Sequence, residues 1–215
     1  MENKGKAFII AVTGGIGSGK SLLSHFTESL GAHIIDADVI AHGIQDSNSA
    51  AAEAIKTAFG EKYYENGKLN RRLLGEAVFS DKEKLDTLNG IMHPLVFKEI
   101  GQRIDKAKNG GAKVILVVIP LLFETAGELL KSLDAVWIIR TKYDDCVQRI
   151  MKRDNCNEEY AKIRISSQMT FIERTDAAKR AGIPFAVINN MGSEETFKKN
   201  IIKALKPRLA CLKSG

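Results

Sequence analysis

A glycine-rich segment near the N-terminus restricts the folds open to this chain. It matches the phosphate-loop pattern G-x-x-x-x-G-K-[ST] and consists of Gly14, Gly15, Ile16, Gly17, Ser18, Gly19, Lys20 and Ser21. An apolar run precedes it, and a helical pattern of apolar residues from Leu22 to Leu30 follows it. A strand, loop and helix in this order predict a site where backbone amides, the helix N-terminus and Lys20 bind phosphates and the Ser21 hydroxyl binds Mg²⁺. A glycine-rich turn without a ligand explains this coincidence less well.

Apolar runs of strand length alternate with helical patterns along the rest of the chain. We expect strands at 8–13, 33–36, 114–119, 135–140 and 185–189, because near-continuous apolar runs are typical of parallel strands covered on both faces. Helical patterns lie at 20–30, 50–59, 71–79, 82–108, 143–153, in pieces over 158–180, and at 194–205. The alternation predicts an α/β fold with a doubly wound parallel sheet of five strands.

The 215 residues suit one core domain that could carry an inserted flap. Two intervals, about 44–110 and about 149–182, carry helical patterns without strands. We expect the first to be a helical substrate-side region and the second a lid. The nucleotide-binding core then comprises about 1–43, 111–148 and 183–215.

Composition excludes several classes of protein. The hydrophobic share of 44% and charged share of 27% argue against disorder, and no apolar run approaches the roughly 18 residues of a membrane span. We therefore expect no membrane partner. Three scattered cysteines do not form a disulfide framework, which favours a cytoplasmic location.

The net charge of +6 fits a nucleic-acid binder and equally an enzyme that acts on polyanionic small molecules. The tail 197–215 has six Lys and Arg residues and no Asp or Glu. A solvated final helix is the preferred interpretation, and a nucleic-acid-binding arm is the alternative. The tail lacks the interleaved aromatic residues on which bases would stack, so we expect no nucleic-acid partner.

Two aspartates, Asp36 and Asp38, follow the second apolar run. Alternation along an extended chain would put both on one face, at the strand end where ligands bind in open α/β sheets. Such carboxylates could accept a hydroxyl proton and help to hold Mg²⁺ through water. The alternative is that one of them caps a following helix.

The sequence does not favour a guanine-nucleotide site. Thr141 to Asp144 imitates the guanine-reading pattern [NT]-K-x-D, but no Asp in the chain has Gly three positions later, as the companion D-x-x-G element requires. We interpret Thr141 instead as the N-cap of the helix that begins nearby.

The whole chain resembles the dephospho-coenzyme A kinase family of P-loop proteins. The resemblance follows the chain in order and rests on the phosphate loop, 31–38, Arg71 ahead of Leu74, His93-Pro94, 120–124, Gln148-Arg149, Arg153-Asp154, Arg164 with Gln168, and 187–192. The phosphate loop is shared widely, whereas the Asp36-Ala-Asp38, His93-Pro94 and 120–124 blocks together are much more specific.

The resemblance implies ATP-dependent phosphorylation of the ribose 3′-hydroxyl of dephospho-coenzyme A, the last step of coenzyme A synthesis. It implies a core, a helical substrate domain and a lid, with ATP and Mg²⁺ as cofactors. We expect a monomer or weak homo-oligomer. It places Asp38 as the base, Lys20, Arg149 and Arg153 at the transferred phosphate, and Leu22, Arg164 and Asn190 at the nucleotide. The acceptor would contact Asp36, Asp38, Arg71, His93, Pro120, Leu121, Leu122, Phe123 and Glu124.

The chain departs from the family pattern at several positions. Leu22 stands where Thr often follows the loop Ser, and Asn189 replaces an acidic residue. The segment 181–185 is slightly longer than usual. Val118 occupies a position where a strand-end Asp often appears, so Mg²⁺ would depend on Ser21, phosphate oxygens, water and the aspartates.

Local alternatives stay open for several of these residues. Arg149 and Arg153 share one helix face, either as phosphate ligands or in ordinary surface ion pairs. His93 could pack in the core or cap a helix. The 120–124 block could contact an apolar substrate arm or close the core, and Glu124 could orient arginines or cap. A kinase for another nucleotide or nucleoside is the rival function within the enzyme class, and a nucleic-acid-binding regulator is the rival outside it.

Overall fold

The computed structural model describes residues 7–47, 49–79, 81–125 and 127–212. The chain divides into two compact units, the first made of residues up to Ile35 and from Ile104 onward, and the second of Asp36–Arg103. Residues 36–43 of the expected core fall in the second unit, whereas the rest of the expected core and the expected lid interval fall in the first.

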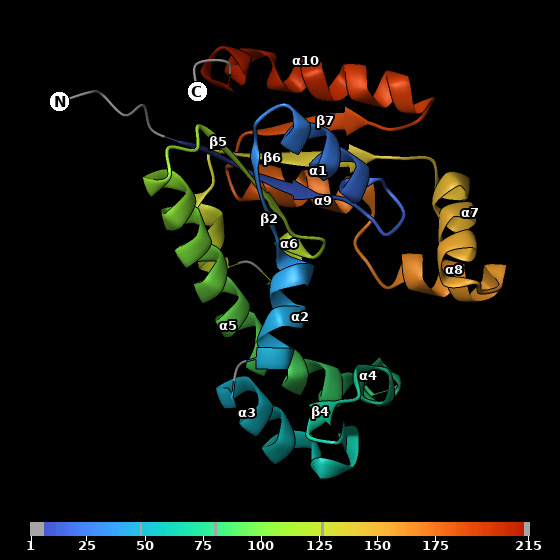
Figure 1. Ribbon diagram of the computed structural model, residues 1–215. Coiled ribbons are helices and arrows are strands. Elements are labelled where there is room, and N and C mark those ends of the chain that lie inside the picture. Colours follow the sequence, from blue (N-terminus) through green and yellow to red (C-terminus); the bar gives the residue numbers. More distant parts are fainter. Residues whose placement is uncertain (1–6, 48, 80, 126, 213–215) are drawn as a thin grey trace. The chain divides into compact units, whose positions relative to one another are not determined.

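The first unit contains a five-stranded parallel sheet (Figure 1). Its strands are β1 (Phe8–Thr13), β2 (His33–Asp36), β5 (Val114–Val118), β6 (Ala135–Arg140) and β7 (Phe185–Asn189), in the order β2-β5-β1-β6-β7. The central strand β1 pairs in parallel with β5 and β6, and β6 with β7. The predicted fold class and all five predicted strands are confirmed, β5 ending at Val118 rather than Ile119.

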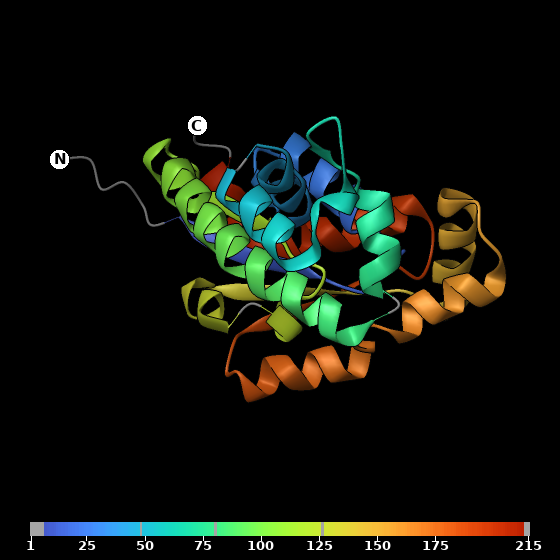
Figure 2. The same ribbon diagram turned by 90° about the horizontal axis from the view of Figure 1, so that it is seen from below.

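Helices cover both faces of the sheet (Figures 1 and 2). Helices α1 (Lys20–Ser29) and α10 (Glu194–Leu212) pack on one face, and α9 (Phe171–Arg180) packs on β6. The first face is a continuous buried cluster that includes Ile10, Val12, Leu23, Leu116, Trp137, Ile188, Phe197, Ile201 and Leu205. The opposite faces of the same strands bury Ile9, Ala11, Ile115, Val117, Val136 and Ile138. Burial on both sides explains why the strands read as continuous apolar runs.

Shorter elements complete the first unit. The loop after β5 leads into α6 (Leu122–Thr125) and the 3-10 helix η2 (Gly127–Ser132). The expected lid interval begins within α7 (Tyr143–Asp154) and includes α8 (Glu158–Ser166) and α9. Helices α7 and α8 pack on each other. Helix α5 (Lys82–Asn109) belongs partly to each unit.

The second unit is mainly helical. It contains α2 (Ala37–Ser47), α3 (Ser49–Phe59), the 3-10 helix η1 (Glu61–Tyr63), α4 (Arg71–Phe79) and most of α5. The expectation that 44–110 has no strands is wrong, because β3 (Tyr64–Glu65) and β4 (Lys68–Leu69) form an antiparallel hairpin. Asn66 (φ 51°) and Gly67 (φ 77°) both adopt left-handed conformations, which a two-residue hairpin turn requires.

The basic tail forms the final helix, as predicted. Helix α10 buries Phe197, Ile201 and Leu205 at helical spacing and continues through Pro207 to Leu212. Residues 213–215 of the tail lie outside the described residues. Across the described ranges, none of the helices has the length and apolar character needed to span a bilayer.

Candidate active site

The phosphate loop lies between the end of β1 and the start of α1. Gly17 (φ 76°) and Gly19 (φ 102°) adopt backbone conformations that residues with a Cβ rarely adopt. A Cβ on Gly19 would lie 2.5 Å from Asn190 Nδ2, and one on Gly17 would lie 3.0 Å from the Cys146 carbonyl oxygen. The loop therefore needs glycine at both positions for conformation and for space.

Lys20, the first residue of α1, folds back over the loop. Its Nζ donates to the carbonyl oxygens of Gly14 (2.8 Å) and Gly15 (3.1 Å). Ser21 follows it in the first turn of α1 and is exposed. Gly19 occupies the N-cap and has no side chain to cap the first turn. This arrangement combines an ammonium group, a hydroxyl and the positive end of a helix, which together suit a polyphosphate.

Two side chains far along the sequence hold the loop from behind. The Ser18 carbonyl oxygen accepts hydrogen bonds from Asn190 Nδ2 (2.8 Å) and Thr141 Oγ1 (3.0 Å). Asn190 is buried, directly after β7. The interpretation of Thr141 as a helix cap is wrong, since Lys142 is the N-cap of α7 and the Thr141 hydroxyl binds the loop instead.

The expected lid reaches the loop through two contacts. The Ile16 amide donates to Gln168 Oε1 (2.9 Å), and Arg149 Nη1 donates to the Gly17 carbonyl oxygen (3.0 Å). Of the three predicted lid arginines, Arg149 is thus the one placed against the loop by a hydrogen bond among the described residues. Sequence reasoning gave no role to the side chain of Gln168 beyond the family resemblance.

The other two lid arginines bind the same carboxylate. Arg153 Nε lies 2.7 Å from Asp154 Oδ1, and Arg164 Nη1 bonds to Asp154 Oδ2. The hydrogen bond from Arg153, together with both positive charges, lowers the pKa of Asp154 below its usual value. Both arginines are partly exposed and lie in a lid-surface ion-pair network in this structure.

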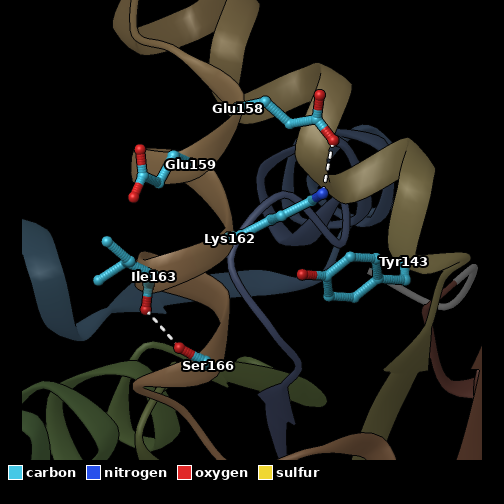
Figure 3. Close-up of a pocket in the computed structure, with 6 residues that line it drawn as sticks. All are labelled: Tyr143, Glu158, Glu159, Lys162, Ile163 and Ser166. Atoms are coloured by element: carbon cyan, nitrogen blue, oxygen red, sulfur yellow. Dashed lines mark hydrogen bonds and ion pairs between the residues drawn. The ribbon is translucent and has the colours of Figure 1, made fainter.

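A surface pocket of about 560 Å³ lies on the α7 and α8 pair (Figure 3). Tyr143, Glu158, Glu159, Lys162, Ile163 and Ser166 line it. Lys162 is paired with Glu158 at 2.6 Å, as the dashed line in Figure 3 marks. None of the predicted site residues lines this pocket, so it is separate from the phosphate loop.

One charged residue beside the loop was missed by the sequence analysis. Arg174, in α9, is only 2% exposed, and its Nη1 donates to the Met169 carbonyl oxygen. Burial lowers the pKa of its guanidinium, while the negative charge of Glu124 acts in the opposite direction. One sequence feature could have identified it. Arg174 lies four residues before Ala178, which is buried, and so shares the apolar face of the helix.

The 120–124 block follows β5, leads into α6 and is hydrogen-bonded to the end of β1. Thr13 Oγ1 donates to the Pro120 carbonyl oxygen (3.0 Å), and Leu122 is fully buried. Leu122 therefore closes the core, as the structural alternative predicted. Leu121 and Glu124 are exposed, and Pro120 and Phe123 are half-buried, so Leu122 is the side chain of this block that solvent does not reach.

The paired aspartates belong to the second unit and differ in role. Asp36 Oδ1 accepts from the amides of Asp38 (2.8 Å) and Val39 (3.3 Å) and so caps α2. The prediction that alternation puts both aspartates on one face is wrong, because the strand ends at Asp36 and Asp38 lies in the first turn of a helix. Asp38 is exposed.

The two remaining acceptor-site predictions also lie in the second unit. Arg71, the first residue of α4, donates through Nη2 to the His42 carbonyl oxygen (2.9 Å). His93 is half-buried in α5, with its ring centroid 5.8 Å from that of Phe97. Burial lowers the pKa of His93 below its usual value. These surroundings agree with the alternative in which His93 packs against other side chains.

The residues present fit a nucleotide better than a metal held by protein ligands. Within the described parts of the chain, His, Cys, Asp and Glu side chains do not gather in threes or more to form a metal site. The loop instead provides a glycine cradle that a Cβ would fill, with Lys20 and Ser21 at its helical end. Such a donor set suits Mg²⁺ that is bound mainly by phosphate oxygens and water.

Comparisons with known proteins agree with this chemistry. The dephospho-CoA kinase family model matches residues 8–194. A dephospho-CoA kinase from Carboxydothermus hydrogenoformans is 36% identical over 199 residues, covering 92% of this chain and 93% of the relative. A solved dephospho-CoA kinase from Campylobacter jejuni is 31% identical, with a TM-score of 0.68 and coverage of 94% and 98%. A Thermus thermophilus crystal structure is also 31% identical, with a TM-score of 0.75 and coverage of 97% and 99%.

Proposed function

This chain belongs to the dephospho-coenzyme A kinase family, and we propose that it transfers the terminal phosphoryl group of ATP to the ribose 3′-hydroxyl of dephospho-coenzyme A. The family catalyses the final, ATP-dependent step of coenzyme A synthesis. The products are coenzyme A and ADP, and the reaction is an in-line displacement at phosphorus.

The observation that carries the proposal is the cradle formed by residues 14–21 at the end of β1. Lys20 Nζ already donates hydrogen bonds to two carbonyl oxygens of this loop. Phosphate oxygens are stronger acceptors than these carbonyl oxygens. Lys20 would therefore leave the carbonyl oxygens and bind the terminal phosphates of a nucleotide. Loop amides and the N-terminus of α1 add donors without a conformational cost at the moment of transfer.

Mg²⁺ is proposed as the counter-ion of the phosphates. When bound, it would neutralise charge on the transferred group, with the Ser21 hydroxyl as its protein ligand. The buried Val118 at the end of β5 supplies no second carboxylate, which supports a site built mainly from phosphate oxygens and water.

We assign the role of proton acceptor to Asp38. Asp36 Oδ1 caps α2 by accepting from two backbone amides. If Asp36 bound the substrate instead, these hydrogen bonds would break and the first turn of α2 would be weakened. Asp38 is exposed in the same turn and reaches solvent. A carboxylate there can orient the 3′-hydroxyl and take its proton as the bond to phosphorus forms.

Lid residues are proposed to act on the phosphates. Arg149 is already hydrogen-bonded to the loop at Gly17. Arg153 and Arg164 would act only after exchanging Asp154 for phosphate oxygens, since both now bind that carboxylate. Guanidinium groups suit this exchange because their planar donors match carboxylate and phosphate alike.

On the acceptor side, we propose contacts from Arg71, His93 and the 120–124 block. The exposed Leu121 is suited to the apolar pantetheine arm, and Glu124 to a polar or cationic neighbour. The fully buried Leu122 acts through packing. A cytoplasmic location and a monomer or weak homo-oligomer stay predictions.

The direct test is a phosphoryl-transfer assay with ATP and Mg²⁺ across a panel of acceptors. Dephospho-coenzyme A should release ADP and give a product heavier by one phosphoryl group at the ribose, which mass spectrometry with fragmentation would locate. Adenosine, AMP and other nucleosides serve as rival acceptors. Efficient transfer to one of these, with none to dephospho-coenzyme A, would refute the proposal.

A further inference from the structure

We propose that Arg174 binds the terminal phosphate of the nucleotide, as a second cation beside Lys20. The inference rests on the proposed function, because it requires a nucleoside triphosphate in the loop. Neither the phosphate-loop pattern nor the predicted lid arginines include this residue. Its position in α9 and its hydrogen bonding point to the role.

Arg174 is a buried charge with an unused hydrogen-bonding edge. Its Nη1 donates to the Met169 carbonyl oxygen, whereas Nε and Nη2 are buried and have no partner among the described residues. The N–H groups of Nε and Nη2 point the same way, along the edge of the guanidinium that binds two oxygens of one phosphate or carboxylate. A buried cation with an unsatisfied edge is costly, so it indicates a ligand.

The same side chain lies against the loop. Arg174 Nη1 is 3.9 Å from where a Cβ on Gly15 would be, and Lys20 Nζ donates to the Gly15 carbonyl oxygen at 3.1 Å. Two cations thus converge on one residue of the loop, and an anion there would offset their repulsion. Among the described residues of the first unit, the other buried side-chain polar atom without a partner is Ser18 Oγ, in the loop itself.

Glu124 is the alternative occupant of the open edge. Its charge acts on Arg174, but the carboxylate is exposed and leaves Nε and Nη2 without a hydrogen bond. A solvated carboxylate is a weak substitute for a buried partner. We therefore assign the edge to phosphate oxygens and treat Glu124 as the group that keeps the guanidinium oriented and charged.

The connection between α8 and α9 contacts both the loop and Arg174. Gln168 Oε1 accepts from the Ile16 amide, and the next residue, Met169, holds Arg174 Nη1 through its carbonyl oxygen. A phosphate bound by the loop competes with Gln168 for that amide.

The test compares Arg174→Met with Arg180→Met, an exposed arginine on the same helix. Equilibrium dissociation constants for ATP and ADP are measured by calorimetry, without an acceptor, together with thermal unfolding in the presence and absence of each nucleotide. Arg174→Met should weaken ATP binding by about 10- to 100-fold and ADP binding by less than about threefold. Its unfolding temperature without nucleotide should equal or exceed that of the wild type, since a buried unpartnered charge is removed. Arg180→Met should bind both nucleotides normally.

Unchanged ATP affinity in Arg174→Met, or equal losses for ATP and ADP, would overturn the inference. If Arg174→Met unfolds without nucleotide, the result would argue for a structural role. Arg174→Lys then distinguishes phosphate binding from that role, because lysine keeps the charge but lacks the edge with two donors. Arg174→Lys should weaken ATP binding at least fivefold, and wild-type affinity would count against the proposal. Failure of the proposed function is recognised separately, as a wild-type enzyme that binds ATP but does not phosphorylate dephospho-coenzyme A.

Discussion

Asn190 donates from Nδ2 to the Ser18 carbonyl oxygen at 2.8 Å, a buried hydrogen bond that joins the phosphate loop to the end of β7 across 172 residues of chain. The carbonyl also accepts from Thr141 Oγ1 at 3.0 Å. The loop is therefore held in position by the ends of two other strands, β6 and β7. An amide and a hydroxyl far apart in sequence fix the loop before any ligand binds.

Replacing Asn190 by Ala tests this support. The change removes a buried donor, and we expect the free energy of unfolding to fall by about 1–3 kcal/mol and ATP affinity to fall with it. Thr141→Val should cost less, because Thr141 is only half-buried and valine has nearly the same volume, so no cavity is left. Together the two changes should cost more than the sum of the single variants, measured in a double-mutant cycle by denaturant unfolding. Asn189→Ala, on the exposed neighbour, is the control. Additive losses would mean that the two donors do not share one acceptor.

Gly19 provides a second test of the loop. Gly19→Ala must adopt φ near 102° and bring a methyl group 2.5 Å from Asn190 Nδ2. The backbone alone costs about 1–2 kcal/mol, and the contact adds to this. Gly111→Ala has a similar φ of 84° but no neighbour within 4 Å, so it isolates the backbone cost. Thermal unfolding should show the greater loss for Gly19→Ala, and it alone should impair ATP binding. Equal losses would show that crowding against Asn190 is unimportant.

The sheet could be predicted because most of its strands are near-continuous apolar runs. Val114 to Val118 is buried at every position, so each residue of this strand carries a burial signal. The hairpin β3–β4 gave no such signal, because strands of two residues are too short to show periodicity. The turn residues Asn66 and Gly67 are its one sequence feature. The aspartates were placed on one face because a strand was extended past Asp36. Asp36 is instead the cap of α2, so the side-chain period changes from the two residues of a strand to the 3.6 residues of a helix at Ala37.

The candidate site was predictable where chemistry is local in sequence. The phosphate loop provides its glycines, Lys20 and Ser21 within eight residues, and the pattern specifies their arrangement. The partners of that loop are separated from it by more than a hundred residues, and no spacing rule relates Gln168 or Asn190 to Ser18 and Ile16. Arg174 was missed for the opposite reason, because arginine is assumed to be exposed unless packing shows otherwise.

The half-buried imidazole of His93 predicts an acid-sensitive second unit. Burial favours the neutral ring, so the pKa of His93 is lower in the folded than in the unfolded chain, where it is near 6.5. The unfolded chain therefore binds more protons below that value, and this stability contribution is complete above it and lost as the pH falls through the folded pKa. His93→Gln should lose less stability than the wild type between about pH 7 and about pH 5. Urea unfolding at each pH measures this, with His25→Gln on the exposed surface of α1 as the control. A pH dependence identical to wild type in His93→Gln would exclude His93 as the source.

Asp38→Asn separates the proposed base from nucleotide binding. The amide keeps the shape of the side chain but cannot accept the hydroxyl proton, so turnover with dephospho-coenzyme A should fall by about 100- to 10,000-fold. ATP affinity should stay within about twofold, because the loop cradle of residues 14–21 is built without Asp38. Asp36→Asn is the matched comparison: asparagine caps a helix nearly as well as aspartate, so α2 should keep its stability and turnover should fall far less. Steady-state rates with a coupled ADP assay and calorimetric ATP titration give the two quantities independently. Near-normal turnover in Asp38→Asn, or a larger loss in Asp36→Asn, would move the proton-accepting role away from Asp38.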